Sequence, residues 1–139
     1  MPNEVEIHIT SDPRWLGLLR RVVDEFAHHA GFDTKDRHAL LVAVSEAVSN
    51  VMKHSYHGDA EQKLSLGCQI VDGEIEIYIK DKGEAFDPRA KEMLPPDEVR
   101  PGGRGVYLMK EIMDEVEYLR DGDTNCVRMK KYARSPAGQ

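Results

Sequence analysis

The pattern of apolar and polar residues over the first thirty positions predicts a strand followed by an amphipathic helix. Apolar and polar residues alternate over residues 4–9, the two-residue period of a half-buried strand. Asp12 and Pro13 then form a typical helix start, a capping side chain followed by proline at the first helical position. Apolar residues recur at helical spacing over residues 15–26, and Gly31 is a typical helix end.

A second helix is predicted from Asp33 or Thr34 to about His54, with its own apolar stripe. A different face of this helix carries Glu46, Asn50 and His54, each four residues apart. Because four residues turn an α-helix by about 400°, these three side chains are expected to stack along one line.

Two hairpins are predicted where alternating apolar positions flank an Asp-Gly pair. Their strands cover residues 64–70 and 75–79 in the first hairpin, and 116–118 and 127–129 in the second. The expected turns are Asp72-Gly73 and Asp121-Gly122. Hairpins with helices grouped between them predict an α+β fold, a two-layer sandwich with a mixed, mostly antiparallel sheet and helices on one face.

The region between the hairpins has a different character. Residues 82–101 contain four prolines and no clear period, so a mobile loop is expected there. The glycine-rich run 102–105 then opens a short helix. We expect one domain over residues 1–132 and a flexible tail over residues 133–139.

Composition narrows the classes of function. The formal charge of the 139-residue chain is −6 and its basic residues are scattered, which argues against nucleic-acid binding. The sequence has no long apolar run and no secretion signal at its start, so a cytoplasmic location away from membranes is expected. Cys68 and Cys126 lie in strand-like stretches and are interpreted as reduced core thiols.

Glu46 and Asn50 could form a small site, although such a pair alone is more often a solvated polar face. An asparagine offers Mg²⁺ a neutral oxygen, and a glutamate can accept a proton from a hydroxyl. His54 is expected to border this site. His57 is expected in a solvated turn, and a metal site with His54 is disfavoured because no third ligand is evident.

Two later segments carry groups that could bind a base and a phosphate. Asp81 follows a strand directly and can accept a hydrogen bond from a base amine, while Gly83 allows the backbone close to a flat ring. The run Gly102–Gly105 enters a helix, where free backbone N–H groups attract phosphate. Arg104 within it adds a fixed positive charge. The spacing fits neither a Walker loop nor a Rossmann fingerprint.

Taken in order, these segments resemble the three boxes of the Bergerat-fold ATPases. The matching stretches are Glu46-Ala-Val-Ser-Asn50, then Asp81-Lys-Gly83 through Phe86-Asp87, then Gly103-Arg104-Gly105-Val106-Tyr-Leu-Met. The small size and the Gly-Gly-Arg-Gly run are most similar to bacterial anti-sigma factor serine kinases. One departure is Ala85, where the superfamily often has a second glycine.

The resemblance implies a role for each matching residue. Asn50 is expected to bind Mg²⁺, Asp81 the adenine amine and Glu46 the proton of a substrate serine, as general base. Arg104 is expected near the γ-phosphate, with a catalytic role. The remaining residues expected to contact ATP are His54, Gly83, Phe86, Asp87, Gly102, Gly103, Gly105 and Val106.

The implied function is an anti-sigma factor that also acts as an ATP-dependent protein-serine kinase. Its expected partners are a sigma factor, an anti-sigma factor antagonist that it phosphorylates, and a second copy of the chain. Two alternatives stay open: an ATP-dependent partner-binding switch without catalysis, and a stand-alone histidine kinase catalytic domain.

Overall fold

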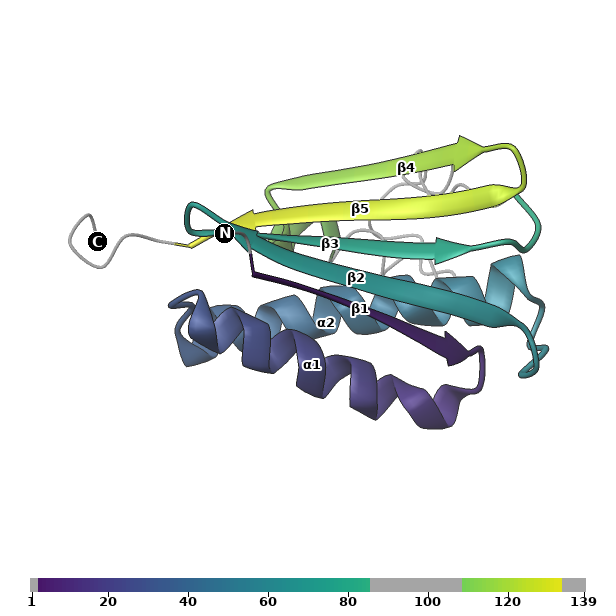
Figure 1. The fold of residues 1–139 in the computed structure, drawn as a ribbon, viewed down its shortest axis with the longest axis horizontal. Coiled ribbons are helices and arrows are strands. Elements are labelled where there is room, and N and C mark those ends of the chain that lie inside the picture. The colour runs from purple at the N-terminus through teal and green to yellow at the C-terminus, as the bar shows by residue number, and fades with distance from the viewer. Residues whose placement is uncertain (1–2, 86–108, 134–139) are drawn as a thin grey trace, which may run out of the picture.

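The structure consists of a five-stranded sheet with a pair of long helices covering one of its faces (Figure 1). This computed structural model describes residues 3–85 and 109–133. The strands are β1 (Asn3–Thr10), β2 (Lys63–Val71), β3 (Glu74–Asp81), β4 (Glu115–Asp121) and β5 (Thr124–Tyr132). The expected α+β sandwich with helices on one face is confirmed.

The strands are arranged in the order β1-β2-β3-β5-β4. All four neighbouring pairs are antiparallel, so within the described residues the predicted mixed sheet has no parallel pair. The two helices form a hairpin between β1 and β2, which returns the chain in the opposite direction beside β1. Ala133, predicted to belong to the tail, still donates its backbone N–H to the Gly73 carbonyl.

Before the second strand the helical segments are η1 (Pro13–Trp15), α1 (Leu16–His29), α2 (Thr34–Asn50) and η2 (Val51–Ser55), and residues 109–112 are helical as well. Asp12 caps the first helical entry through its side chain, as predicted, and Asp33 caps the second, which begins at Thr34. The first turn is a 3₁₀ helix, so α1 itself begins at Leu16. Gly31 follows α1 with a φ of 90°, a left-handed conformation that favours glycine.

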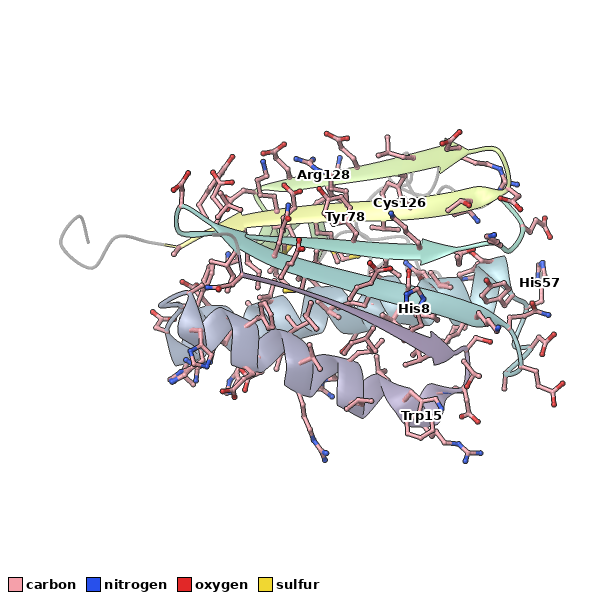
Figure 2. All side chains as sticks on the ribbon, in the orientation of Figure 1. His8, Trp15, His57, Tyr78, Cys126 and Arg128 are labelled. Atoms are coloured by element: carbon pink, nitrogen blue, oxygen red, sulfur yellow. The ribbon has the colours of Figure 1, made fainter. Side chains whose placement is uncertain are left out.

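The core lies between the helix pair and the covered face of the sheet. Its fully buried side chains include Leu19, Val23, Leu40, Val44, Val48, Leu66, Ile75, Ile77, Ile79 and Met129. The apolar stripe of α1 is only partly used, because Trp15 and Leu18 remain 40% and 41% exposed. Trp15 projects from the start of α1 on the side away from the sheet (Figure 2).

The first hairpin turn lies where it was predicted, and the second is shifted by one residue. Asp72 and Gly73 both have positive φ values, 52° and 77°, as a tight two-residue hairpin turn requires. In the second hairpin Asp121 pairs with Thr124, so the turn residues are Gly122 and Asp123 rather than Asp121 and Gly122.

Both cysteines are free, as expected. Burial raises the pKa of the Cys68 thiol to about 12. Among the described residues, no helix combines the length and apolar character that a membrane crossing demands.

Candidate functional site

A small pocket, about 20 Å³ in volume, lies where the end of α2 faces strands β3, β4 and β5. The helical side contributes Ala47, Asn50, Val51 and Ser55, and the sheet contributes Asp81, Tyr118, Leu119, Asn125, Cys126 and Val127. The pocket therefore brings together Asn50 and Asp81, two of the predicted site residues. They come from segments that are distant in sequence and meet because α2 packs across the sheet.

Asn50 is the last residue of α2 and is only 7% exposed. Its side-chain Nδ2 is buried and has no hydrogen-bond partner among the described residues. A buried polar group without a partner costs about 1–3 kcal/mol, so native proteins rarely keep one without a reason. A hydrogen-bond acceptor entering the pocket, such as a phosphate oxygen, would satisfy the Nδ2 donor of Asn50, while a metal ion could be held only by its side-chain oxygen.

The helix changes geometry directly after Asn50. Residues Val51–Ser55 form a π-helical turn, a rare feature that is frequent at functional sites. In such a turn the repeat lengthens from four to five residues. Ser55, five residues after Asn50, consequently lines the pocket where α-helical spacing predicted His54. The predicted stacking holds for Glu46 and Asn50 but does not extend to His54.

Gly83 packs against the backbone of the π-helical turn. A Cβ atom added at Gly83 would lie 2.3 Å from the carbonyl oxygen of Ser55, well inside contact distance. The next residue, Glu84, donates its backbone N–H to the same oxygen at 2.9 Å. Glycine is required at this position by close packing within the chain, a reason different from the predicted approach of a ring.

Asp81 is the last residue of β3 and is 4% exposed. Its Oδ1 accepts hydrogen bonds from the Gly83 backbone N–H and from Nδ2 of Asn125, both at 2.9 Å. These two bonds hold the carboxyl group in one orientation. Its second oxygen can accept a further bond from a ligand in the pocket.

Asn125 is a site residue that the sequence pattern did not reveal. Besides Asp81, its Nδ2 donates to the carbonyls of Gly83, at 3.3 Å, and Glu84, at 3.1 Å. Its Oδ1 accepts a 2.7 Å bond from Arg120. A signal was available, because Asn125 occupies an inward-facing position of β5 where the alternation calls for an apolar residue.

Tyr56 is a second residue that the sequence pattern missed. Its side chain is buried. The hydroxyl donates to the Lys63 carbonyl and accepts the backbone N–H of Lys82, the residue after Asp81, at 2.8 Å. Burial is the largest cause that raises the pKa of Tyr56 above its usual value. Tyr56 ties the beginning of β2 to the chain after β3, and no feature of the sequence indicates this.

Of the other predicted residues, two are described by the structure and the rest lie outside the described residues. Glu46 is half-buried on α2, one turn before Asn50, and His57 lies in an exposed turn with its Nε2 2.6 Å from Glu84. His57 has a φ of 51° and is labelled in Figure 2. Outside the described residues lie Phe86, Asp87, Gly102, Gly103, Arg104, Gly105 and Val106.

Comparisons with known proteins identify the family of this chain. The family model of the histidine kinase-like ATPase domain matches residues 9–131. The chain is 30% identical to the serine-protein kinase RsbW of Bacillus velezensis, over 92% of this chain and 84% of that protein. It is 34% identical to RsbW of Bacillus pumilus, over 81% of this chain and 76% of that protein.

Solved structures support the fold. The RsbU and RsbW domains of Rv1364c from Mycobacterium tuberculosis superpose with a TM-score of 0.71 at 15% identity, covering 96% of this chain and 33% of that one. The histidine kinase domain of a blue-light activated kinase from Erythrobacter litoralis gives a TM-score of 0.54 at 17% identity, covering 89% of this chain and 61% of that one. This chain belongs to the histidine kinase-like ATPase domain family and, within it, to the RsbW serine-protein kinases.

Proposed function

We propose that this domain binds ATP with Mg²⁺ in the pocket between α2 and the sheet, and transfers the γ-phosphoryl group to a serine of a partner protein. One observation carries the proposal. The buried Asn50 Nδ2, which has no partner among the described residues, and the Asp81 carboxylate, which is held through its Oδ1, line the same pocket. Membership of the RsbW family supplies the reaction class, ATP-dependent phosphorylation of serine.

Asp81 would recognise the adenine base. A carboxylate accepts hydrogen bonds only, so it favours a base with an exocyclic amine over a base with a carbonyl at that position. Asn125 and the Gly83 N–H hold Asp81 in place from one side, which lowers the cost of orienting the carboxylate when the base arrives.

Asn50 would hold the metal ion through its side-chain oxygen. Mg²⁺ prefers oxygen ligands, and when bound it neutralises charge on the phosphates. Glu46 lies one helical turn before Asn50, so both groups are presented by the same rigid helix. We assign Glu46 as the general base that takes the proton from the attacking serine hydroxyl.

Arg104 and the glycine run 102–105 would bind the phosphates. Backbone N–H groups and a guanidinium are suited to this, because together they surround phosphate oxygens with donors. In this assignment Arg104 contributes a positive charge near the γ-phosphate, while Phe86, Asp87 and Val106 complete the nucleotide contacts.

The proposed protein partners are an anti-sigma factor antagonist, which supplies the serine, and a sigma factor, which is sequestered in the alternate state. A second copy of the chain is a further proposed partner. These proposals rest on the family relationship and on the net charge of −6, which disfavours direct binding to nucleic acid.

The decisive experiment combines the purified protein with [γ-³²P]ATP, Mg²⁺ and the antagonist. We expect acid-stable label on a serine. The Glu46→Gln variant should lose at least about 100-fold in rate, the low end of general base catalysis, while calorimetry still detects ATP binding. The control variant Ser49→Ala, on the same helix, should retain labelling.

Other outcomes identify the alternatives. Acid-labile label on a histidine would indicate a histidine kinase catalytic domain. Bound ATP that persists without transfer, together with nucleotide-dependent capture of the antagonist, would indicate a switch. If Asn50→Ala binds Mg·ATP as tightly as the native protein, the assigned pocket is wrong.

A further inference from the structure

The sheet face that the helices leave uncovered carries a groove of about 400 Å³ above Gly67 in β2. The residues that line the groove around this glycine from the uncovered face are Glu4, Glu6, Ser65, Gln69, Tyr78 and Lys80, and Val5 and Cys68 also border it. Gly67 and the six residues of the uncovered face point away from the core, and all are described by the structure. The groove is therefore separate from the pocket around Asn50, which lies on the helix-covered face.

Gly67 has no structural reason to be glycine within the described chain. It is paired with Glu6 on one side and Tyr78 on the other in an unbroken register, so it marks no bulge. Its φ is not positive, and an added Cβ would meet only Tyr78 Cβ at 3.9 Å, an ordinary contact. A glycine inside a strand weakens the strand, and it often marks close approach by a ligand or another chain.

The groove has a negative end on β1. Glu6 lies 3.0 Å from His8, which is charged only when protonated, and Glu4 has no ion pair with any described residue. By contrast, Glu76 on the same face is paired with Arg128 and Lys130 at 3.4 Å. Negative charge without a matching cation is therefore concentrated beside Gly67.

The opposite wall is aromatic. Tyr78 stands next to Gly67 across the β2–β3 pair, and its hydroxyl is bonded to Glu76. Figure 2 labels Tyr78 and Arg128 on neighbouring strands of this uncovered face. Lys80 lies on β3 at the corner diagonal to Glu4, so it makes that corner positive and gives the groove a direction.

We propose that this groove receives an arginine side chain of a partner protein, with the aliphatic stem over Gly67 and the guanidinium between Glu4 and Glu6. Arginine fits better than lysine, because a planar guanidinium can fork to carboxylates while the aliphatic stem lies beside the ring of Tyr78. Lys80 repels a cation at the other corner and directs it toward β1. The inference does not depend on the nucleotide site.

The test uses the ¹⁵N-labelled chain and N-acetyl-L-arginine amide as the probe, followed by NMR. We expect saturable shifts at the amides of Gly67 and its neighbours, with a Kd in the millimolar range. The neutral isostere N-acetyl-L-citrulline amide should bind at least 5-fold more weakly. The peptide acetyl-Gly-Arg-Gly-amide should bind at least as tightly as the single residue, because a partner protein presents the side chain from a backbone.

Variants separate this proposal from a fold defect. Gly67→Val fills the floor of the groove and should weaken probe binding at least 10-fold, while Tm stays level or rises because β-branched residues favour strands. Glu6→Gln should weaken binding about 3-fold, and Lys80→Gln should strengthen it about 2-fold by removing like charge.

Three results would overturn the proposal: equal binding of the arginine and citrulline probes, native-like binding by Gly67→Val, or weaker binding of the peptide. If Gly67→Val does not fold, the double variant Glu4→Gln/Glu6→Gln leaves the glycine in place. Native-like binding of the arginine probe by that double variant would equally sink the idea. Labelling of the antagonist by Gly67→Val should proceed as in the native protein, so failure of the kinase proposal remains distinguishable.

Discussion

On the helix-covered face of the sheet, the polar side chains are few, buried and bonded mainly around Asp81 and Asn125. On the uncovered face they are numerous and form cross-strand ion pairs, as Arg128 does with Glu76 and Glu117. A buried group must find its partners within the protein, whereas an exposed group can exchange partners with water. Changes on the covered face should therefore cost more.

Two glycines illustrate the same difference. Gly83 is closed in by the Ser55 backbone, so no other residue fits there without displacement. Gly67 faces open space, with its closest neighbour at an ordinary contact distance. The residue type is identical, and only the surroundings distinguish a glycine that packing requires from one that packing leaves free.

The largest expected effect is that of Gly83→Ala. The added methyl group overlaps backbone atoms of the π-helical turn, and overpacking of this kind costs about 1–3 kcal/mol, with the upper end expected here. The free energy of unfolding, measured by urea denaturation, should fall accordingly. Gly67→Ala is the matched control and should leave it unchanged or slightly raised. Equal stability of the two variants would contradict the comparison.

The next effect concerns Asn125→Ala. This change removes the donor shared by Asp81, Gly83 and Glu84, and unfolding should become about 2 kcal/mol easier because buried acceptors lose their partner. ATP affinity measured by calorimetry should also fall. The neighbouring Thr124→Ala, whose hydroxyl bonds the exposed Asp123 side chain, serves as control and should cost less than about 0.5 kcal/mol. A native ATP affinity in Asn125→Ala would refute its orienting role.

On the uncovered face, Arg128→Gln should cost about 1 kcal/mol at low salt. Arg128 approaches three carboxylates, those of Glu76, Glu115 and Glu117. Its side chain is 17% exposed, so part of the interaction is screened by solvent ions. The difference from the native protein should shrink at 1 M NaCl. A difference that does not change with salt would point to lost packing instead of lost charge.

The smallest expected effect concerns the rate at which the two cysteine thiols are alkylated. Burial is the first cause that raises the pKa of both cysteines, to about 12 for Cys68. Only the thiolate is nucleophilic, so at pH 8 iodoacetamide should modify Cys126 slowly and Cys68 hardly at all, as read by mass spectrometry. Because the folded pKa of Cys68 is raised, its stabilising contribution is complete below about pH 9 and declines as the pH rises toward 12. Rapid modification of Cys68 at pH 8 would contradict its burial.

The local pattern was sufficient for most elements. Alternation located both hairpins, Asp12 and Asp33 located the helical entries, and Gly31 located the end of α1. These features depend on interactions between residues close in the chain, such as a cap that bonds a backbone N–H three positions later. The second hairpin turn was misplaced by one residue because both Asp121-Gly122 and Gly122-Asp123 contain turn-forming types.

What the sequence alone determined is the two-layer architecture and the presence of Asn50 and Asp81 as candidates for one site. The tertiary structure decided how they meet: the π-helical turn that puts Ser55 instead of His54 at the pocket, the donors that hold Asp81, and the contact that requires Gly83. These features join α2, β3 and β5, which are far apart in the chain. Periodicity reports the environment of one segment at a time, so contacts between segments become visible only after the segments have packed.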